Sequence, residues 1–177
     1  TLNIILELLH HHHVGTRCVE ILEHYLKKIY NHKREDDLIR LLHLITQKYS
    51  ELIDSQLINI IIVVKKIVID SLDNNNQQID KIRACLAIIM NLGTKIDRVL
   101  HLFFIDITQM LSLNNDKYEE KKINSPKEYI SNKILSDYLT FVLFLTEHCP
   151  SISYYLPSIR LFIISYFHKE IQALQNR

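Results

Sequence analysis

The chain has 177 residues, 47% of them hydrophobic, so it is long enough to bury a full core within one domain. It carries 21 basic and 20 acidic residues, and the net charge of +1 gives no general attraction to nucleic acid or anionic membranes. With only two Gly and three Pro, the chain lacks the turn residues that sheets and loop-rich folds need. The composition therefore predicts an all-α protein.

In chain order, apolar periodicity predicts a series of amphipathic helices. They are expected over about residues 2–12, 18–30, 35–49, 56–72, 77–92, 94–113, 126–148 and 157–174. Gly15 and Gly93 are placed to end the helices that precede them. Residues 50–55 read as a polar break, and the series Ser125, Pro126, Lys127 and Glu128 forms a capping box with Pro at the first helical position.

One apolar stripe recurs three times at a constant offset of 39 residues. Its positions are i, i+3, i+4, i+7 and i+11, which is the spacing of a helix that buries one face. The three sets are Cys18, Ile21, Leu22, Tyr25 and Ile29; Leu57, Ile60, Ile61, Val64 and Val68; and Ile96, Val99, Leu100, Phe103 and Ile107. The β-branched second set would also suit a strand, but its register with the other two favours a helix. Because this helix is apolar nearly all round, we expect it to be buried on most sides, with Ile61 fully buried. On the last helix, the expected inward stripe consists of Ile159, Phe162, Tyr166 and Ile171.

A helix that recurs at this interval, with a second helix in between, is typical of stacked helical pairs. We expect four antiparallel hairpins over residues 2–30, 35–72, 77–113 and 126–174. The domain reading is three hairpin repeats in residues 1–113, a polar insertion in 114–125, and a fourth hairpin of the same domain in 126–177.

The repeat resembles HEAT and armadillo repeats, whose units have a similar length. Two segments carry the resemblance, because Thr16-Arg17-Cys18-Val19 and Ile82-Arg83-Ala84-Cys85 are similar to the VR-x-x-A element of HEAT helices. The resemblance implies a short HEAT-like α-solenoid, in which successive hairpins stack and present long surfaces to other proteins.

Several local features have both a chemical and a structural interpretation. His10 to His13 are consecutive on a helix and point in different directions, so the sequence predicts a solvated helix end and no metal site. The acidic residues 35–37 suit the first turn of a helix, where the helix dipole favours them. Cys18, Cys85 and Cys149 have no metal-ligand spacing and read as reduced core residues of an intracellular protein. No cofactor motif is present, so no cofactor is expected.

Three features leave a binding role open. Tyr154, Tyr155 and Tyr166 suit either an interface anchor or the packed end of the last hairpin. Lysines at 27, 28, 65 and 66 suit a basic stripe or an ordinary solvated face. Arg17, Gln56 and Lys95 occupy equivalent turns of successive hairpins, so they could line one edge of the stack and meet an acidic or amide-rich partner.

The sequence therefore predicts a non-enzymatic scaffold or adaptor segment of a larger intracellular protein, either cytoplasmic or nuclear. The expected partner is another protein or a peptide segment. Neither nucleic-acid binding nor a membrane span is expected, because the charge is balanced and the apolar run over 57–64 is too short. The alternative is a compact helical bundle that binds a partner helix in a hydrophobic groove, as domains resembling apoptosis regulators do.

Overall fold

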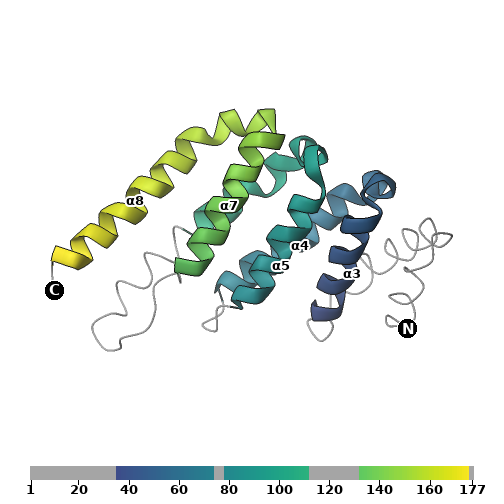
Figure 1. Ribbon diagram of the computed structural model, residues 1–177, viewed down its shortest axis with the longest axis horizontal. Coiled ribbons are helices and arrows are strands. Elements are labelled where there is room, and N and C mark those ends of the chain that lie inside the picture. The colour runs from purple at the N-terminus through teal and green to yellow at the C-terminus, as the bar shows by residue number, and fades with distance from the viewer. Residues whose placement is uncertain (1–34, 74–77, 112–131, 176–177) are drawn as a thin grey trace.

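The computed structural model describes residues 35–73, 78–111 and 132–175 (Figure 1). These residues are almost entirely helical and contain no strand, which confirms the all-α prediction for this part of the chain. The elements are α3 (Glu35–Lys48), η3 (Ser50–Gln56), α4 (Leu57–Asp73), α5 (Ile79–Asn91), η4 (Gly93–Leu102), a helix over residues 104–111, α7 (Asn132–His148), η5 (Pro150–Tyr155) and α8 (Leu156–Gln175).

The described residues fall into three units of the same design, in which an α-helix, a 3₁₀-helix and a second α-helix follow one another. We call residues 35–73 the first unit, 78–111 the second and 132–175 the third. The leading helices α3, α5 and α7 lie side by side in chain order (Figure 1). Helix α5 packs against both helices of the first unit, and α7 packs against α5 and η4.

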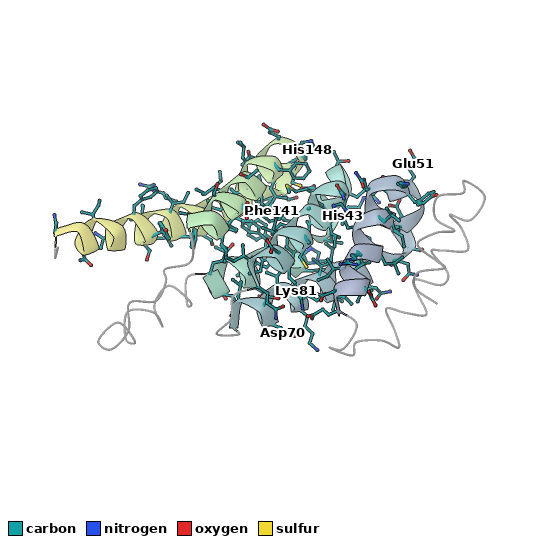
Figure 2. The ribbon with its side chains drawn as sticks, turned by 60° about the horizontal axis from the view of Figure 1, so that its bottom comes forward. His43, Glu51, Asp70, Lys81, Phe141 and His148 are labelled. Atoms are coloured by element: carbon teal, nitrogen blue, oxygen red, sulfur yellow. The ribbon has the colours of Figure 1, made fainter. Side chains whose placement is uncertain are left out.

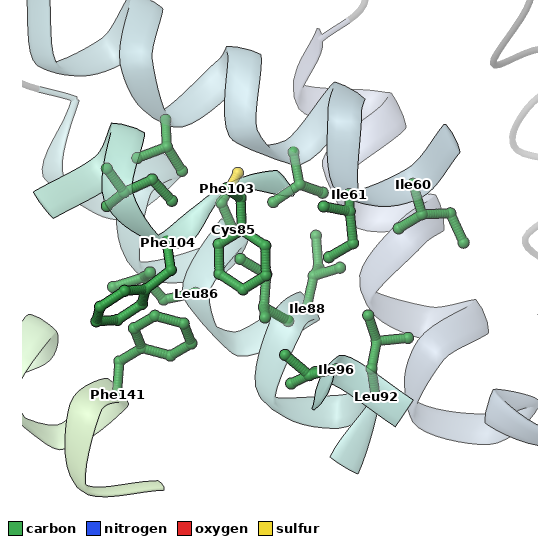
Figure 3. Packing of buried hydrophobic residues seen from close by; sticks show 14 of the residues in the cluster. Ile60, Ile61, Cys85, Leu86, Ile88, Leu92, Ile96, Phe103, Phe104 and Phe141 are labelled. Atoms are coloured by element: carbon green, nitrogen blue, oxygen red, sulfur yellow. The ribbon is translucent and has the colours of Figure 1, made fainter. Parts of the chain in front are cut away.

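The predicted apolar stripe forms the core of the first two units. All ten of its described positions are buried, from Leu57 to Val68 and from Ile96 to Ile107, and Ile61 is fully buried as predicted. In the close view of Figure 3, Ile60, Ile61, Cys85 and Ile88 gather in the same interior. Figure 2 shows the contrast with the surface, since Phe141 lies among the helices whereas Glu51 lies at the outside.

Two predicted boundaries are wrong. The single helix expected over 94–113 is a 3₁₀-helix, η4, followed by an α-helix that begins at residue 104. In a 3₁₀-helix residues three apart lie on one side, so Ile96 and Val99 are both buried without an α-helical turn. The expected polar break over 50–55 is also a 3₁₀-helix, η3, which carries the fully buried Ile53 onto the core.

Two burial predictions also need correction. Helix α4 is not covered on all sides, because Ile58 and Ile62 are exposed on the face opposite the stripe. In α8 the sequence predicts Ile171 on the inward stripe with Ile159, Phe162 and Tyr166, yet Ile171 is exposed while the other three are buried. Apolar periodicity identified the helices, but these helices carry more apolar residues than their neighbours cover.

Polar contacts join the leading helices at specific points. Lys81 of α5 lies between two carboxylates of α3, with its Nζ 2.8 Å from Glu35 Oε2 and 3.2 Å from Asp36 Oδ1. Burial disfavours the charged form of Lys81, but these two hydrogen bonds outweigh it and raise the pKa of the lysine. Arg83 of α5 donates to Asp137 Oδ2 of α7 from Nε at 2.9 Å and from Nη2 at 2.7 Å.

The predictions for the first hairpin over 2–30, the insertion over 114–125 and the capping box at 125–128 fall outside the described residues. The histidines at 10–13 and the lysines at 27 and 28 fall outside them as well.

Candidate functional site

The predicted edge of the stack is occupied by contacts between the units. Lys95 of η4 reaches back to η3, where its Nζ donates to the Ser50 backbone oxygen at 2.6 Å and to Asp54 Oδ1 at 2.6 Å. The hydrogen bond from Lys95 lowers the pKa of the Asp54 carboxyl group. At the next joint, the Ser151 backbone N–H of η5 donates to Asp97 Oδ1 of η4 at 2.8 Å. The 3₁₀-helices are thus tied together in order.

These contacts limit how much of the three predicted partner-binding residues is available to a partner protein. Gln56 is buried, and its Oε1 accepts a hydrogen bond from the Asn59 side-chain amide at 2.9 Å, so it offers a partner little surface. Lys95 keeps only a partly exposed side chain and uses its ammonium group within the protein. Arg17 lies outside the described residues. A binding row made of these three residues therefore stays a prediction.

Lys65 of α4 also helps to hold the units together. Lys65 Nζ lies 2.8 Å from Asp106 Oδ2, and this ion pair joins α4 to the helix over residues 104–111. At the offset of 39 residues Lys66 corresponds to Ile105, next to Asp106, and the structure shows that this acid is a partner of Lys65. This pairing favours a role between units over a basic stripe for nucleic acid.

Helix α8 presents a different kind of surface, because it has apolar residues on two opposite faces. Its inward face consists of Ile159, Phe162 and Tyr166, and the ring of Phe162 meets that of Tyr138 in α7 edge-on at 5.1 Å between centroids. At 100° per residue, a second set of apolar residues occupies the opposite side of the helix. This set, all of it exposed, comprises Leu161, Ile164, Phe167 and Ile171.

Helix α7 adds an open apolar groove at the same end of the row. The groove has a volume of about 360 Å³ and is lined by Leu135, Leu139 and Leu143, one turn apart, with Ser136 and Thr140 beside them. We call the seven apolar residues of these two helices together the terminal apolar face, which consists of two separate patches, one on each helix. They are Leu135, Leu139 and Leu143 of α7 and Leu161, Ile164, Phe167 and Ile171 of α8.

The position of the terminal apolar face follows from the arrangement of the units. In Figure 1, α7 and α8 stand at the end of the row of described helices, and α8 extends beyond α7. Sequence reasoning missed this face because it assigned one apolar stripe to each helix. The signal was present, since α8 carries apolar residues at 161, 164 and 167 in addition to the inward stripe.

The tyrosines of the third unit divide between surface and interior. Tyr154 is strongly exposed, whereas Tyr166 is buried, and the ring of Tyr155 packs on that of Phe104 with centroids 5.3 Å apart. The buried Tyr138 shares a hydrogen bond of 2.7 Å with the Thr108 hydroxyl, and burial raises its pKa to about 12. Of these side chains, Tyr154 contributes most to the outer surface of the third unit, since Tyr155 is partly buried.

Cys85 and Cys149 are free thiols that lie buried in the core. Burial raises the pKa of Cys85 to about 12 and that of Cys149 to about 11, so both thiols are protonated at neutral pH. Across residues 35–73, 78–111 and 132–175, no three His, Cys, Asp or Glu side chains are grouped as metal ligands. Within the same ranges, no helix has the length and apolar character needed to cross a bilayer.

Comparison with known proteins returned no matching family model, curated protein or solved structure. The site is therefore defined by geometry alone. Its main features are an apolar groove on α7, an exposed apolar row on α8 and a row of leading helices that contact one another in chain order.

Proposed function

We propose that the chain is a non-enzymatic scaffold or adaptor segment of a larger intracellular protein, and that it acts by holding another protein. The stacked units suit this role because each contributes a helix to an extended surface. The arrangement also supports a short α-solenoid of the HEAT type, with hairpins that contact their neighbours in chain order.

The terminal apolar face is the observation that carries this proposal. Soluble monomers rarely expose large contiguous apolar patches, and those that do commonly use them to bind proteins or membranes. Leu161, Ile164, Phe167 and Ile171 follow one another along a single side of α8, so their exposed surface is continuous along the helix. Covering such a row with a partner would remove several large side chains from water, and the hydrophobic effect favours that change.

A compact bundle with a helix-binding groove is the second candidate, and the groove on α7 favours it. The order of the leading helices favours the stack instead, because α5 lies between α3 and α7 (Figure 1). In a compact bundle, we would expect the outer helices to close around a shared core. Both candidates imply binding of another protein, so they differ in shape more than in the kind of partner.

Small-angle scattering of the purified chain separates these two shapes. A compact domain of 177 residues should have a radius of gyration of about 16 Å. The stack should give a clearly larger value and a pair-distance distribution with a long tail. A symmetric distribution at the compact value would contradict the solenoid arrangement.

Affinity capture from the cells that naturally make the protein tests the binding role. The tagged chain should recover a protein partner in stoichiometric amount, and the recovered partner should bind again when both proteins are purified. If repeated captures, including captures after chemical cross-linking, recover no such partner, the scaffold proposal is wrong.

A further inference from the structure

The exposed apolar row of α8 lies on the side of the helix that faces away from α7. The inward side packs on α7, where the buried ring of Phe162 meets that of Tyr138 edge-on. At 100° per residue, Ile164 and Ile171 lie on the opposite side of the helix from Phe162, and each is 54% exposed. Because α8 stands at the end of the row of helices and extends beyond α7 (Figure 1), another helix can lie along this side.

The exposed row has nearly the same spacing in both directions along the helix. Its members are Leu161, Ile164, Phe167 and Ile171. Two copies of α8 can lie antiparallel about a twofold axis near residue 166, so that Ile164 of each copy faces Phe167 of the other. Leu161 of each copy then faces Ile171 of the other. Every member of the row meets an apolar side chain, and the row is therefore complementary to itself.

The position of Arg160 fits the same antiparallel arrangement. Its side chain is exposed one turn before Ile164, on the same side of α8. In the antiparallel pair, Arg160 lies beside the last turn of the other α8, which ends at Gln175. The last carbonyl groups of a helix lack partners within it and carry the negative end of its dipole, so they attract a guanidinium group. A parallel pair would instead bring the two Arg160 side chains together.

The exposed area of the row is that of a small, reversible interface. Leu161 is 69% exposed, and the other three members are 53–54% exposed. With about 180 Å² for a large side chain that is fully exposed, the row offers roughly 400 Å² on each copy. The polar side chains beside the row bring the total contact to about 1,000 Å², at the low end for specific association. Dimerisation in the micromolar range is therefore expected.

From these features we infer that the chain forms an antiparallel homodimer through the exposed row of α8. In a twofold interface the same patch meets itself, so the patch has to be self-complementary. The row meets this requirement in its spacing and in the position of Arg160, and binding to an unrelated protein requires neither. The inference goes beyond the scaffold proposal, because it assigns the row on α8 to a second copy and leaves the groove on α7 for another protein.

Sedimentation velocity of the full chain at about 1 to 200 μM tests the dimer. The average mass should rise with concentration from 21.0 kDa towards twice that value. Ile164→Asp and Phe167→Asp should each raise the dissociation constant of the dimer by at least about tenfold, because each places a charge in an apolar contact.

Ile58→Asp is the matched control for these variants. Ile58 lies on α4 and is 55% exposed, against 54% for Ile164. It should leave the dissociation constant unchanged, and circular dichroism should show the same helicity and melting temperature for all the variants. If Ile164→Asp alters the melting temperature, Ile164→Gln takes its place as a milder change at the same site.

Cysteine cross-linking tests the direction of the two helices. A tagged Leu161→Cys chain is mixed with an untagged Ile171→Cys chain and treated with a short bismaleimide, and the original chain controls for its own thiols. The mixture should give a cross-linked pair of one tagged and one untagged chain. Each variant alone should give little, because about ten residues of helix, or about 15 Å, separate the two equivalent positions along the axis.

Charge reversal tests the contact of Arg160 with the end of the other helix. Arg160→Glu should weaken the dimer by about threefold or more, because the carboxylate would face the negative end of the helix dipole. The difference from the original chain should shrink as NaCl is raised, since the contact lies at the surface. An equal or stronger dimer for Arg160→Glu would contradict the antiparallel arrangement.

Other results would overturn the dimer itself. One is a chain that remains a monomer at 200 μM, and another is an equal effect of Ile58→Asp and Ile164→Asp. Cross-linking of each variant alone as efficiently as of the mixture would exclude the antiparallel pair. If a partner captured from cells binds a chain that remains a monomer, this inference fails while the scaffold proposal stands.

Discussion

Replacing Ile61 and Ile62 in turn by Ala tests the packing of α4 with two neighbouring residues of the same type. Ile61 is fully buried in the core, whereas Ile62 is 48% exposed on the outer side of the helix. Both substitutions remove the same atoms. Both also raise the intrinsic helix propensity by the same few tenths of a kcal/mol, because the two sites are neighbours in the interior of one helix. The difference between the two variants therefore reports burial alone.

The expected magnitudes follow from this difference. Ile to Ala removes three carbon groups, and at about 0.8 kcal/mol each their lost burial costs about 2.4 kcal/mol at a fully buried site. A residual cavity at Ile61 adds to this, so Ile61→Ala should lower the free energy of unfolding by about 3 kcal/mol, within the usual range of 2 to 5. Ile62 is about half exposed, so Ile62→Ala loses only about half of this burial free energy. The gain in helix propensity offsets part of that loss, which leaves a decrease of less than about 1 kcal/mol.

Urea denaturation followed by circular dichroism at 222 nm measures both values in the full chain. The unfolding midpoints should separate while the slopes remain equal, because neither change alters the surface exposed on unfolding by much. Equal losses for the two variants, or a larger loss for Ile62→Ala, would refute the assigned register of α4. In that case the stripe at 57, 60, 61, 64 and 68 would not face the core.

Three further predictions concern a turn, an ion pair and a thiol. Gly93 has φ of 58° and no atom within 4 Å of a built Cβ, so Gly93→Ala should cost about 1 kcal/mol in unfolding experiments through backbone strain alone. Gly93→Asn should cost less, and an equal loss would contradict this explanation. In a double-mutant cycle, Arg83→Gln with Asp137→Asn should give a weak coupling that falls in high salt, because Arg83 is partly exposed; a salt-independent coupling would argue against an ionic contact. Burial raises the pKa of Cys85 from 9.0 to about 12, so the unfolded state releases this proton first and the free energy of unfolding should fall as pH rises above about 9. Cys85→Ala should reduce that slope in denaturation curves at pH 8 to 11, and an unchanged slope would show that other groups cause it.

The helical class, the core stripes of α4 and the second unit, and the end of α7 at His148 could all be predicted from the sequence. These features depend on local spacing, since residues at i, i+3, i+4 and i+7 share a side of any helix regardless of its neighbours. For the same reason, the spacing of the apolar residues is sufficient to place Ile61 in the core.

Which of the additional apolar residues remain exposed depends on how the helices pack against one another. Helices α4 and α8 each carry apolar side chains on opposite sides, and spacing cannot say which side another helix will cover. Leu86 and Leu143 illustrate this, because each lies five residues before the last residue of its helix. Leu86 is buried in α5, against which α7 packs, whereas Leu143 is exposed in α7. The role of Lys95 also depended on a distant contact, since Asp54 lies 41 positions away along the chain. Periodicity describes one helix at a time, whereas burial and ion pairing depend on which surfaces meet when the units stack.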